Sequence, residues 1–312
     1  MTARRLSGVV TTLDNAATLD ACLTSLAFCD EIVVLDSGST DATLEIAQRH
    51  GARIATQPFA GYGPQKQAAI ELANGEWILL LDADEHMSDA GRIAIERELS
   101  APRAGGYRLP RQEWLFWRWP HVGTRANWQL RLFRTAAGRM NAVPVHAAPE
   151  VDGRVIDLLA PFRHYGEPHL ADRVDKVNRY STGLVAYKRG GRTSFMAVRL
   201  LFYPAVAFLK LYLGKRYFLN GWAGYFAART QAFYAFLKYA KVLEAQRQEE
   251  AAPGPLGERD TPSGCRLKRR CNHRYCDGAS RTMASIAAFT WALSATTSSV
   301  GMGSNGGAMR ST

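Results

Sequence analysis

The stretch Trp77-Ile-Leu-Leu-Leu-Asp-Ala-Asp-Glu85 decides the fold class of this chain. It begins with five apolar residues, a pattern typical of a strand buried on both faces of a parallel sheet. Asp82 and Asp84 follow at positions i and i+2, so their carboxylates point the same way where that strand is expected to end. Carboxylate pairs hold Mg²⁺ or Mn²⁺ together with substrate phosphates, although two acids can also simply begin a solvated loop. The rest of the chain must separate these two readings.

Strands and helices alternate in the residues that precede this stretch. The pattern predicts strands at 8–13, 31–35, 53–56 and 77–81, with helices at about 15–26, 42–50 and 64–73. Such alternation indicates βαβ units and an α/β fold with a mostly parallel sheet. Ligands of these sheets bind outside the carboxyl ends of the strands. Polar clusters stand at three of those ends, at 11–14, 36–41 and 82–85, and this coincidence favours a binding site over a solvated loop.

Beyond residue 88 the pattern changes twice. Further strands are expected at 106–110 and 129–133, and a helix is expected at 170–188. Residues 195–241 then combine many aromatic side chains with Lys and Arg, as helices in a membrane interface do. The alternative is a helical hairpin packed on the catalytic domain. The apolar run 200–209 is far shorter than the ~20 residues of a spanning helix.

Composition bounds the possible partners. The chain has 312 residues, 47% of them hydrophobic and 21% charged, with a net charge of +11. This composition is globular, and the basic surplus favours a polyanionic or membrane-surface partner. Residues 251–312 are rich in Gly, Ser, Thr, Ala and Arg, which predicts disorder, and their cysteines fit no zinc site. The first residues carry no apolar secretory segment, so a cytoplasmic protein is expected.

Several motifs occur together in this order and carry a resemblance to a known family. The segments 33–41 and 77–85 resemble family 2 glycosyltransferases, which are inverting enzymes with the GT-A fold that use nucleotide-sugar donors. The chain is most similar to the subgroup of lipopolysaccharide-core biosynthesis. Further motifs of that subgroup are Gln65-Lys66-Gln67, Arg131 to Arg134, Val145-His146, His164-Tyr165 and Asn178 to Ser181.

The resemblance implies roles for the polar strand ends. Asp36 would hydrogen-bond the nucleotide base, in a pocket also lined by Thr11, Asp14 and Ser37. Asp82 would reach the ribose or the metal, and Asp84 would hold the Mg²⁺ or Mn²⁺ that bridges the diphosphate. Lys66 would add a second positive charge. Departure of a nucleoside diphosphate builds negative charge on oxygen, and cations stabilise that charge.

Inversion also requires a base that takes the proton of the acceptor hydroxyl. The subgroup often has Val-His-Glu at this point, whereas this chain reads Val145-His146-Ala147. The expected glutamate is therefore absent. The candidates that remain are His146, Glu150 and Asp152, with Glu85 as an outside candidate.

These observations predict a GT-A catalytic domain at 1–190, a membrane-associating helical segment at 191–248 and a disordered tail at 249–312. The expected activity is transfer of a sugar from a nucleotide-diphosphate donor to a lipid-linked glycan such as lipopolysaccharide core. The expected location is the cytoplasmic face of the inner membrane, on an anionic surface. Three alternatives stay open: a polyprenyl-phosphate acceptor, a family member that only binds donor, and a basic nucleic-acid-binding protein.

Overall fold

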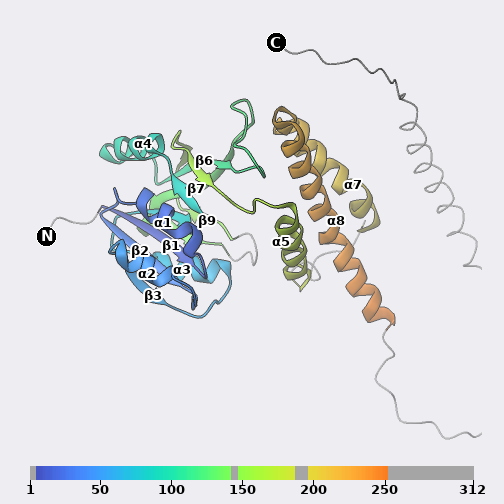
Figure 1. Ribbon diagram of the computed structural model, residues 1–312, viewed down its shortest axis with the longest axis horizontal. Coiled ribbons are helices and arrows are strands. Elements are labelled where there is room, and N and C mark those ends of the chain that lie inside the picture. Colours follow the sequence, from blue (N-terminus) through green and yellow to red (C-terminus); the bar gives the residue numbers. More distant parts are fainter. Residues whose placement is uncertain (1–4, 142–146, 187–195, 252–312) are drawn as a thin grey trace, which may run out of the picture. The chain divides into compact units, whose positions relative to one another are not determined.

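Four apolar strands form the parallel part of the central sheet (Figure 1). The computed structural model describes residues 5–141, 147–186 and 196–251. The parallel strands are β1 (Leu6–Thr12), β2 (Glu31–Asp36), β3 (Arg53–Thr56) and β4 (Trp77–Asp82), in the order β3-β2-β1-β4. Their connections are helices α1 (Ala16–Ser25), α2 (Thr43–Arg49) and α3 (Tyr62–Glu71). The predicted parallel α/β sheet is confirmed.

The second half of the sheet contains antiparallel pairs. Strand β7 (Asn127–Arg134) runs antiparallel to both β4 and β6 (Gly106–Glu113). Strand β11 (Phe162–His164) then lies parallel to β6, with β5 (Glu85–Met87) antiparallel at its other edge. The remaining elements are β10 (Val155–Asp157) beside β6, helix α4 (Asp89–Ser100), a 3-10 turn η1 (Thr135–Ala137), and a small sheet of β8 (Gly138–Met140) and β9 (Pro149–Val151).

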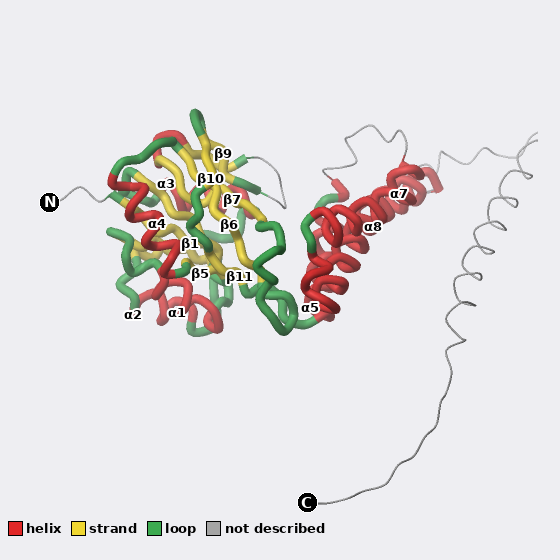
Figure 2. The backbone as a smooth tube through the Cα atoms, turned by 90° about the horizontal axis from the view of Figure 1, so that it is seen from above, coloured by secondary structure: helices red, strands yellow, loops and turns green. Residues whose placement is uncertain are grey.

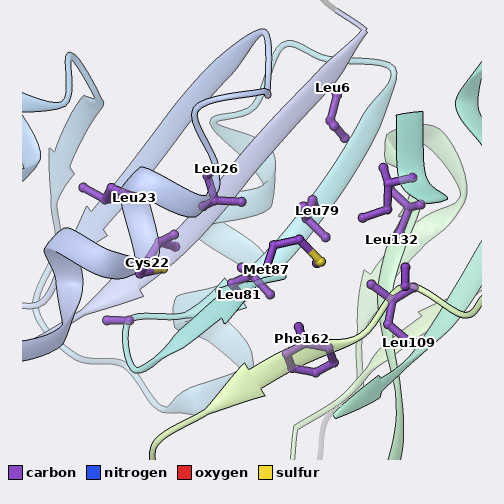
Figure 3. Packing of buried hydrophobic residues seen from close by; sticks show 14 of the residues in the cluster. Leu6, Cys22, Leu23, Leu26, Leu79, Leu81, Met87, Leu109, Leu132 and Phe162 are labelled. Carbon is purple, nitrogen blue, oxygen red and sulfur yellow. The ribbon is translucent and has the colours of Figure 1, made fainter. Parts of the chain in front are cut away.

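The two faces of the parallel strands build two hydrophobic clusters, because alternate side chains of a strand point to opposite faces. Leu79 and Leu81 pack with Leu23 of α1 on one face (Figure 3). Ile78 and Leu80 pack with residues of α3 on the other face. A sheet covered in this way is stable only if both faces are apolar, which explains the continuous apolar run of β4.

The register of the parallel strands gathers their carboxyl ends at one edge. Thr12 lies opposite Asp36, and Thr11 lies opposite Asp82. The antiparallel pairing of β11 with β5 then places His164 opposite Glu85. Residues from four separate parts of the chain therefore meet around the end of β4.

Three helices follow the sheet and lie side by side (Figure 2). They are α5 (Leu170–Gly183), α7 (Met196–Leu209) and α8 (Gly221–Ala251), with the turns η2 (Lys210–Gly214) and η3 (Tyr217–Asn220) between the last two. Phe116, from the loop after β6, packs with Tyr217 and Ala227. Within the described ranges, no helix is both long and apolar enough to cross a membrane. His146, the residues around the predicted boundary at 190 and those of the predicted tail from 252 on lie outside the described residues.

Candidate functional site

The loops that follow β1 and β2 are tied together by the residues predicted to bind the nucleotide. Asp36 is fully buried, and its carboxylate accepts the backbone N–H groups of Gly38 and Ser39 at 2.8 Å each, together with the Ser39 hydroxyl. The Ser39 oxygen in turn accepts the N–H of Asp14 at 2.8 Å. The Asp14 carboxylate accepts the N–H of Thr40 at 2.8 Å. The Ser39 hydroxyl and the Asp14 carboxylate thus join the two loops.

Asp14, Asp36 and Ser37, three of the four residues predicted for the nucleotide pocket, lie in or next to these two joined loops. Ser37 donates its N–H to the carbonyl oxygen of Thr12 at 2.9 Å and is partly exposed. Thr11 is also partly exposed and stands beside Asp82 across the pair of β1 and β4. The assignment of these residues to a nucleotide remains a prediction, but the structure brings them together.

Asp82 is neutralised by two cations of the protein. Lys66 of α3 forms an ion pair with one carboxylate oxygen, and Arg131 Nη2 lies 3.1 Å from the other. Burial alone raises the pKa of Asp82, but the charges of Lys66 and Arg131 outweigh it and hold the pKa well below its usual range. Lys66 and Asp82, both predicted site residues, are therefore in direct contact.

Glu85 closes the turn that follows β4. Its side chain is buried, and one oxygen accepts the N–H of Asp82 at 3.0 Å. The other oxygen lies 2.7 Å from Arg131 Nη2 and 3.5 Å from Arg111 Nη1. Burial and the charge of Asp82 raise the pKa of Glu85, while the two arginines lower it, with a net rise. This enclosed carboxylate holds the turn, and sequence reasoning assigned no such role to Arg131 or Arg111.

Asp84 pairs with a histidine from a distant part of the chain. His164 Nε2 lies 3.1 Å from Asp84 Oδ2, and the Asp84 side chain keeps 31% of its surface exposed. Burial by itself raises the pKa of Asp84 and lowers the pKa of His164. The hydrogen bond between the two nevertheless lowers the pKa of Asp84 and raises the pKa of His164. The only sequence signal for His164 was its membership of a His-Tyr motif.

The Asp84–His164 pair has the donor set that a divalent cation in a nucleotide site needs. Mg²⁺ and Mn²⁺ in such sites take one or two protein ligands, and phosphate oxygens complete the coordination. In the described ranges there is no group of three or more His, Cys, Asp or Glu that could hold a metal by itself. Of the two predicted metal ligands, Asp84 is better placed to hold a cation than Asp82, whose two oxygens already contact cations.

The predicted base candidates lie elsewhere. Glu150 and Asp152 are exposed, and both form ion pairs with Arg139, at 3.8 and 2.8 Å. Among the described residues, no hydrogen bond or ion pair joins either of them to the Asp84–His164 pair. A carboxylate that sequence reasoning missed, Glu113 at the end of β6, lines a cavity together with His164.

Two cavities meet at the Asp84–His164 pair. A cavity of about 360 Å³ is lined by Asp84, and another of about 610 Å³ is lined by His164. Trp114 and Gly166 line both of them. Asp84 and His164, which contact each other, therefore line neighbouring cavities.

Comparison with known proteins identifies the family. The family model described as Glycosyl transferase family 2 matches residues 7–135. The chain is 33% identical over 251 residues to the lipopolysaccharide core biosynthesis glycosyltransferase LpsC of Rhizobium meliloti (strain 1021), covering 77% of this chain and 92% of LpsC. The chain belongs to glycosyltransferase family 2. The predicted family and its GT-A-like α/β fold are thereby confirmed, and membership supports a transferase over the nucleic-acid-binding alternative.

Other members of the family and solved structures resemble the chain less closely. The uncharacterized glycosyltransferase RP128 of Rickettsia prowazekii (strain Madrid E) is 27% identical, over 77% of this chain and 87% of its own length. S. aureus TarS 1-349 is 17% identical with a TM-score of 0.42, covering 78% of this chain and 92% of that one. Glucosyl-3-phosphoglycerate synthase from Mycobacterium tuberculosis, solved with Mg2+ and uridine-diphosphate, is 24% identical with a TM-score of 0.31, covering 35% and 44%.

Proposed function

We propose that this family 2 glycosyltransferase moves a sugar, with inversion, from a nucleotide-diphosphate donor to a lipid-linked glycan of the lipopolysaccharide-core type. The observation that carries the proposal is the contact between Asp84 and His164 at the carboxyl end of β4, with the Lys66–Asp82 ion pair beside it. The similarity to LpsC supports the acceptor class. The Asp84–His164 pair would hold the Mg²⁺ or Mn²⁺.

The chemistry follows from the charges around the pair. A bound cation supplies positive charge that stabilises the departing diphosphate. Lys66 is paired with Asp82, and from this position it can add a second positive charge to the same phosphates. Because Arg131 and Glu85 fix the turn that carries Asp82 and Asp84, these charges are in position before the reaction begins.

The proton of the acceptor hydroxyl must pass to a base. His146, Glu150 and Asp152 remain the predicted candidates. Glu113 joins them because it faces the larger cavity beside His164, and the charge of Arg111 outweighs burial to keep the pKa of Glu113 below its ordinary value. The lowered pKa keeps Glu113 ionised at neutral pH, but it also makes Glu113 a weaker base than a carboxylate whose pKa lies near the working pH, so its place beside His164 is what makes it a candidate.

A donor screen tests the proposed activity as a whole. We expect one nucleotide sugar to raise the melting temperature in the presence of Mn²⁺, and to be consumed when a lipopolysaccharide-core acceptor is added. Polyprenyl phosphate is the second acceptor to supply, because the same donor site would serve it. If no nucleotide sugar either stabilises the protein or turns over with any acceptor, the proposed function is wrong.

Asp36→Asn is expected to weaken nucleotide binding by about 1.5–3 kcal/mol, the range for a hydrogen bond to a charged group. The substitution keeps the side-chain shape and one acceptor oxygen for the turn, so a normal melting temperature should accompany the loss. Calorimetric titration of the best nucleotide measures it. Ser39→Ala serves as the matched control, because it removes only the hydroxyl that joins the two loops. Equal losses in both variants would mean that Asp36 acts by shaping the turn and not by contacting the base.

We further propose that the protein docks on the inner membrane through α7 and the start of α8. Leu201 and Phe202 are 66% and 64% exposed on α7, and Trp222 is 70% exposed on α8. Apolar side chains in such numbers on one segment are unfavourable in water and favourable at the acyl–headgroup boundary. An enzyme docked there would meet lipid-linked acceptors in the plane in which they diffuse.

Liposome sedimentation tests the docking proposal. We expect binding to anionic vesicles, weaker binding to neutral ones, and partial release in high salt, because each basic residue near such a surface contributes ~1 kcal/mol that salt screens. Leu201→Ser with Phe202→Ser should reduce binding to both vesicle types. The control is Ile93→Ser, which removes an apolar side chain that is 55% exposed on α4. A protein that stays in the supernatant with every vesicle would contradict the proposal.

A further inference from the structure

The larger cavity is strongly basic. It has a volume of about 610 Å³ and lies among the ends of β6 and β7, the helices α5, α7 and α8, and the turn after α7. Among the described residues that line it, the carboxylates are Glu113 and Glu167, and each is already paired with a basic residue, Arg111 and Lys176 respectively. The other basic side chains of its lining are Arg125, Arg173, Lys210, Lys215 and Lys238. The cavity thus has a large excess of positive charge.

Four of these side chains have no carboxylate partner. In the described part of the chain, no ion pair includes Arg125, Arg173, Lys210 or Lys215. Lys215 donates to the carbonyl oxygen of Ala126 at 3.0 Å, which points its charge toward the loop before β7. Like charges held together in a cavity raise the free energy of the empty state, and an anion that enters relieves this repulsion.

Arg173 is one of the basic side chains of the cavity that form no ion pair in the described part of the chain. Its guanidinium donates to the carbonyl oxygens of Glu167 and Trp114, at 2.8 and 2.7 Å, and lies over the ring of Phe116. Burial lowers the pKa of Arg173 more than the charges of Glu113 and Glu167 raise it. The guanidinium is therefore held in place by neutral groups, with its charge left for a ligand.

Aromatic side chains complete the lining. Trp114, Tyr180, Tyr203, Tyr217 and Tyr234 contribute to the cavity wall. Aromatic walls with a few charged groups are typical of sites for small molecules, and a cavity of this size lies within the usual range for such sites. Flat apolar rings suit the apolar faces of a sugar, and the cations suit a phosphate.

We propose that this cavity binds a phosphorylated sugar of the acceptor. The proposal rests on the proposed glycosyl transfer and adds the chemical class that the acceptor side recognises. His164 lines this cavity and contacts Asp84, which lines the neighbouring one, so an acceptor seated here reaches the Asp84–His164 pair. Tyr203, Val206 and Ala207 line the cavity from a single face of α7, and Lys210 follows them at the start of η2.

Calorimetric titration with glucose 6-phosphate, and with glucose as the neutral counterpart, tests the proposal without a membrane. We expect the wild-type protein, saturated with its nucleotide, to bind the phosphate and not glucose. Arg125→Gln with Lys210→Gln should weaken phosphate binding at least tenfold, while nucleotide affinity is unchanged. Arg199→Gln is the matched control, because it removes a charge from α7 outside the cavity lining, and it should change neither affinity.

A second experiment measures the KM for a lipid-linked acceptor. With a lipid-linked acceptor, the double variant should raise KM at least tenfold when the acceptor is phosphorylated, and the difference should disappear after phosphatase treatment. Equal binding of glucose 6-phosphate to the wild type and the double variant would overturn the proposal for this cavity, even if the wild-type protein turns over its nucleotide-sugar donor. A wild-type protein that neither binds a nucleotide nor turns over a nucleotide sugar would instead contradict the proposed function. The two failures are therefore distinguishable.

Discussion

Asp84→Asn is expected to reduce glycosyl transfer at least about a thousandfold. A divalent cation at a departing phosphate contributes several kcal/mol of transition-state stabilisation, and each 1.36 kcal/mol corresponds to a factor of about ten in rate. Asparagine keeps the shape of the side chain but removes the charge that holds the cation. The variant should fold normally, because Asp84 is partly exposed at the end of a strand and not in the core.

The measurements for Asp84 separate binding from chemistry. Mn²⁺ binding in the presence of nucleotide, followed by electron paramagnetic resonance, should weaken in Asp84→Asn and also in His164→Gln. Asp20→Asn is the control, because Asp20 is an exposed acid on α1. Turnover that persists in excess EDTA, or an Asp84→Asn variant with wild-type activity, would rule out the cation assignment.

Arg131→Met is expected to lower the free energy of unfolding by about 3–5 kcal/mol. Arg131 is buried, and it contacts both Glu85 and Asp82. Removing one partner of a buried ion pair leaves the other charge without compensation, and this cost exceeds the net contribution of the pair. Methionine fills most of the volume and can still pack on Phe162, whose ring lies under the guanidinium, so the loss should be mainly electrostatic.

Urea unfolding measures the loss, and two further variants interpret it. Arg134→Met removes an exposed arginine of the same strand, whose ion pair with Glu76 is solvated, and should cost no more than about 1 kcal/mol. Adding Glu85→Gln to Arg131→Met should restore part of the stability, because the buried negative charge is then gone. If Arg131→Met and Arg134→Met are equally stable, the buried network does not hold the turn.

The fold was largely predictable because its signals are local. The apolar run of β4 and the polar residues directly after it stand next to one another in the sequence, and the alternation of strands and helices fixes a parallel sheet. Asp82 and Lys66 were also expected to work together, and they are in contact. Their roles toward donor and metal remain predictions.

The partners of the acidic residues could not be predicted in the same way. Asp84 and His164 are 80 positions apart, and they meet only because β11 pairs with β5 in one particular register. Arg131 stands between Leu130 and Leu132 in β7, and the identity of its buried partners depends on the strand order β4-β7-β6. Long-range pairings of this kind leave no local periodicity in a single sequence.

The helices after the sheet were predicted only in part. Aromatic and basic residues at 195–241 indicated membrane-interface helices or a packed hairpin, and the observed helices combine features of both. Phe116 packs on Tyr217 and Ala227, while Leu201 and Phe202 stay exposed. Composition alone could not divide these aromatic residues between cavity, core and surface, since the division depends on which face of α7 packs against α8.

The hydroxyl of Ser39 has a consequence for selectivity among nucleotides. It donates to Asp36 and accepts from the backbone of Asp14, so the loops after β1 and β2 are joined by hydrogen bonds of the protein itself. A rigid receptor loses little conformational entropy when a ligand arrives, and its shape cannot adapt to a poor one. If this edge binds the nucleotide base as predicted, selectivity would come from excluding bases whose shape does not fit the joined loops.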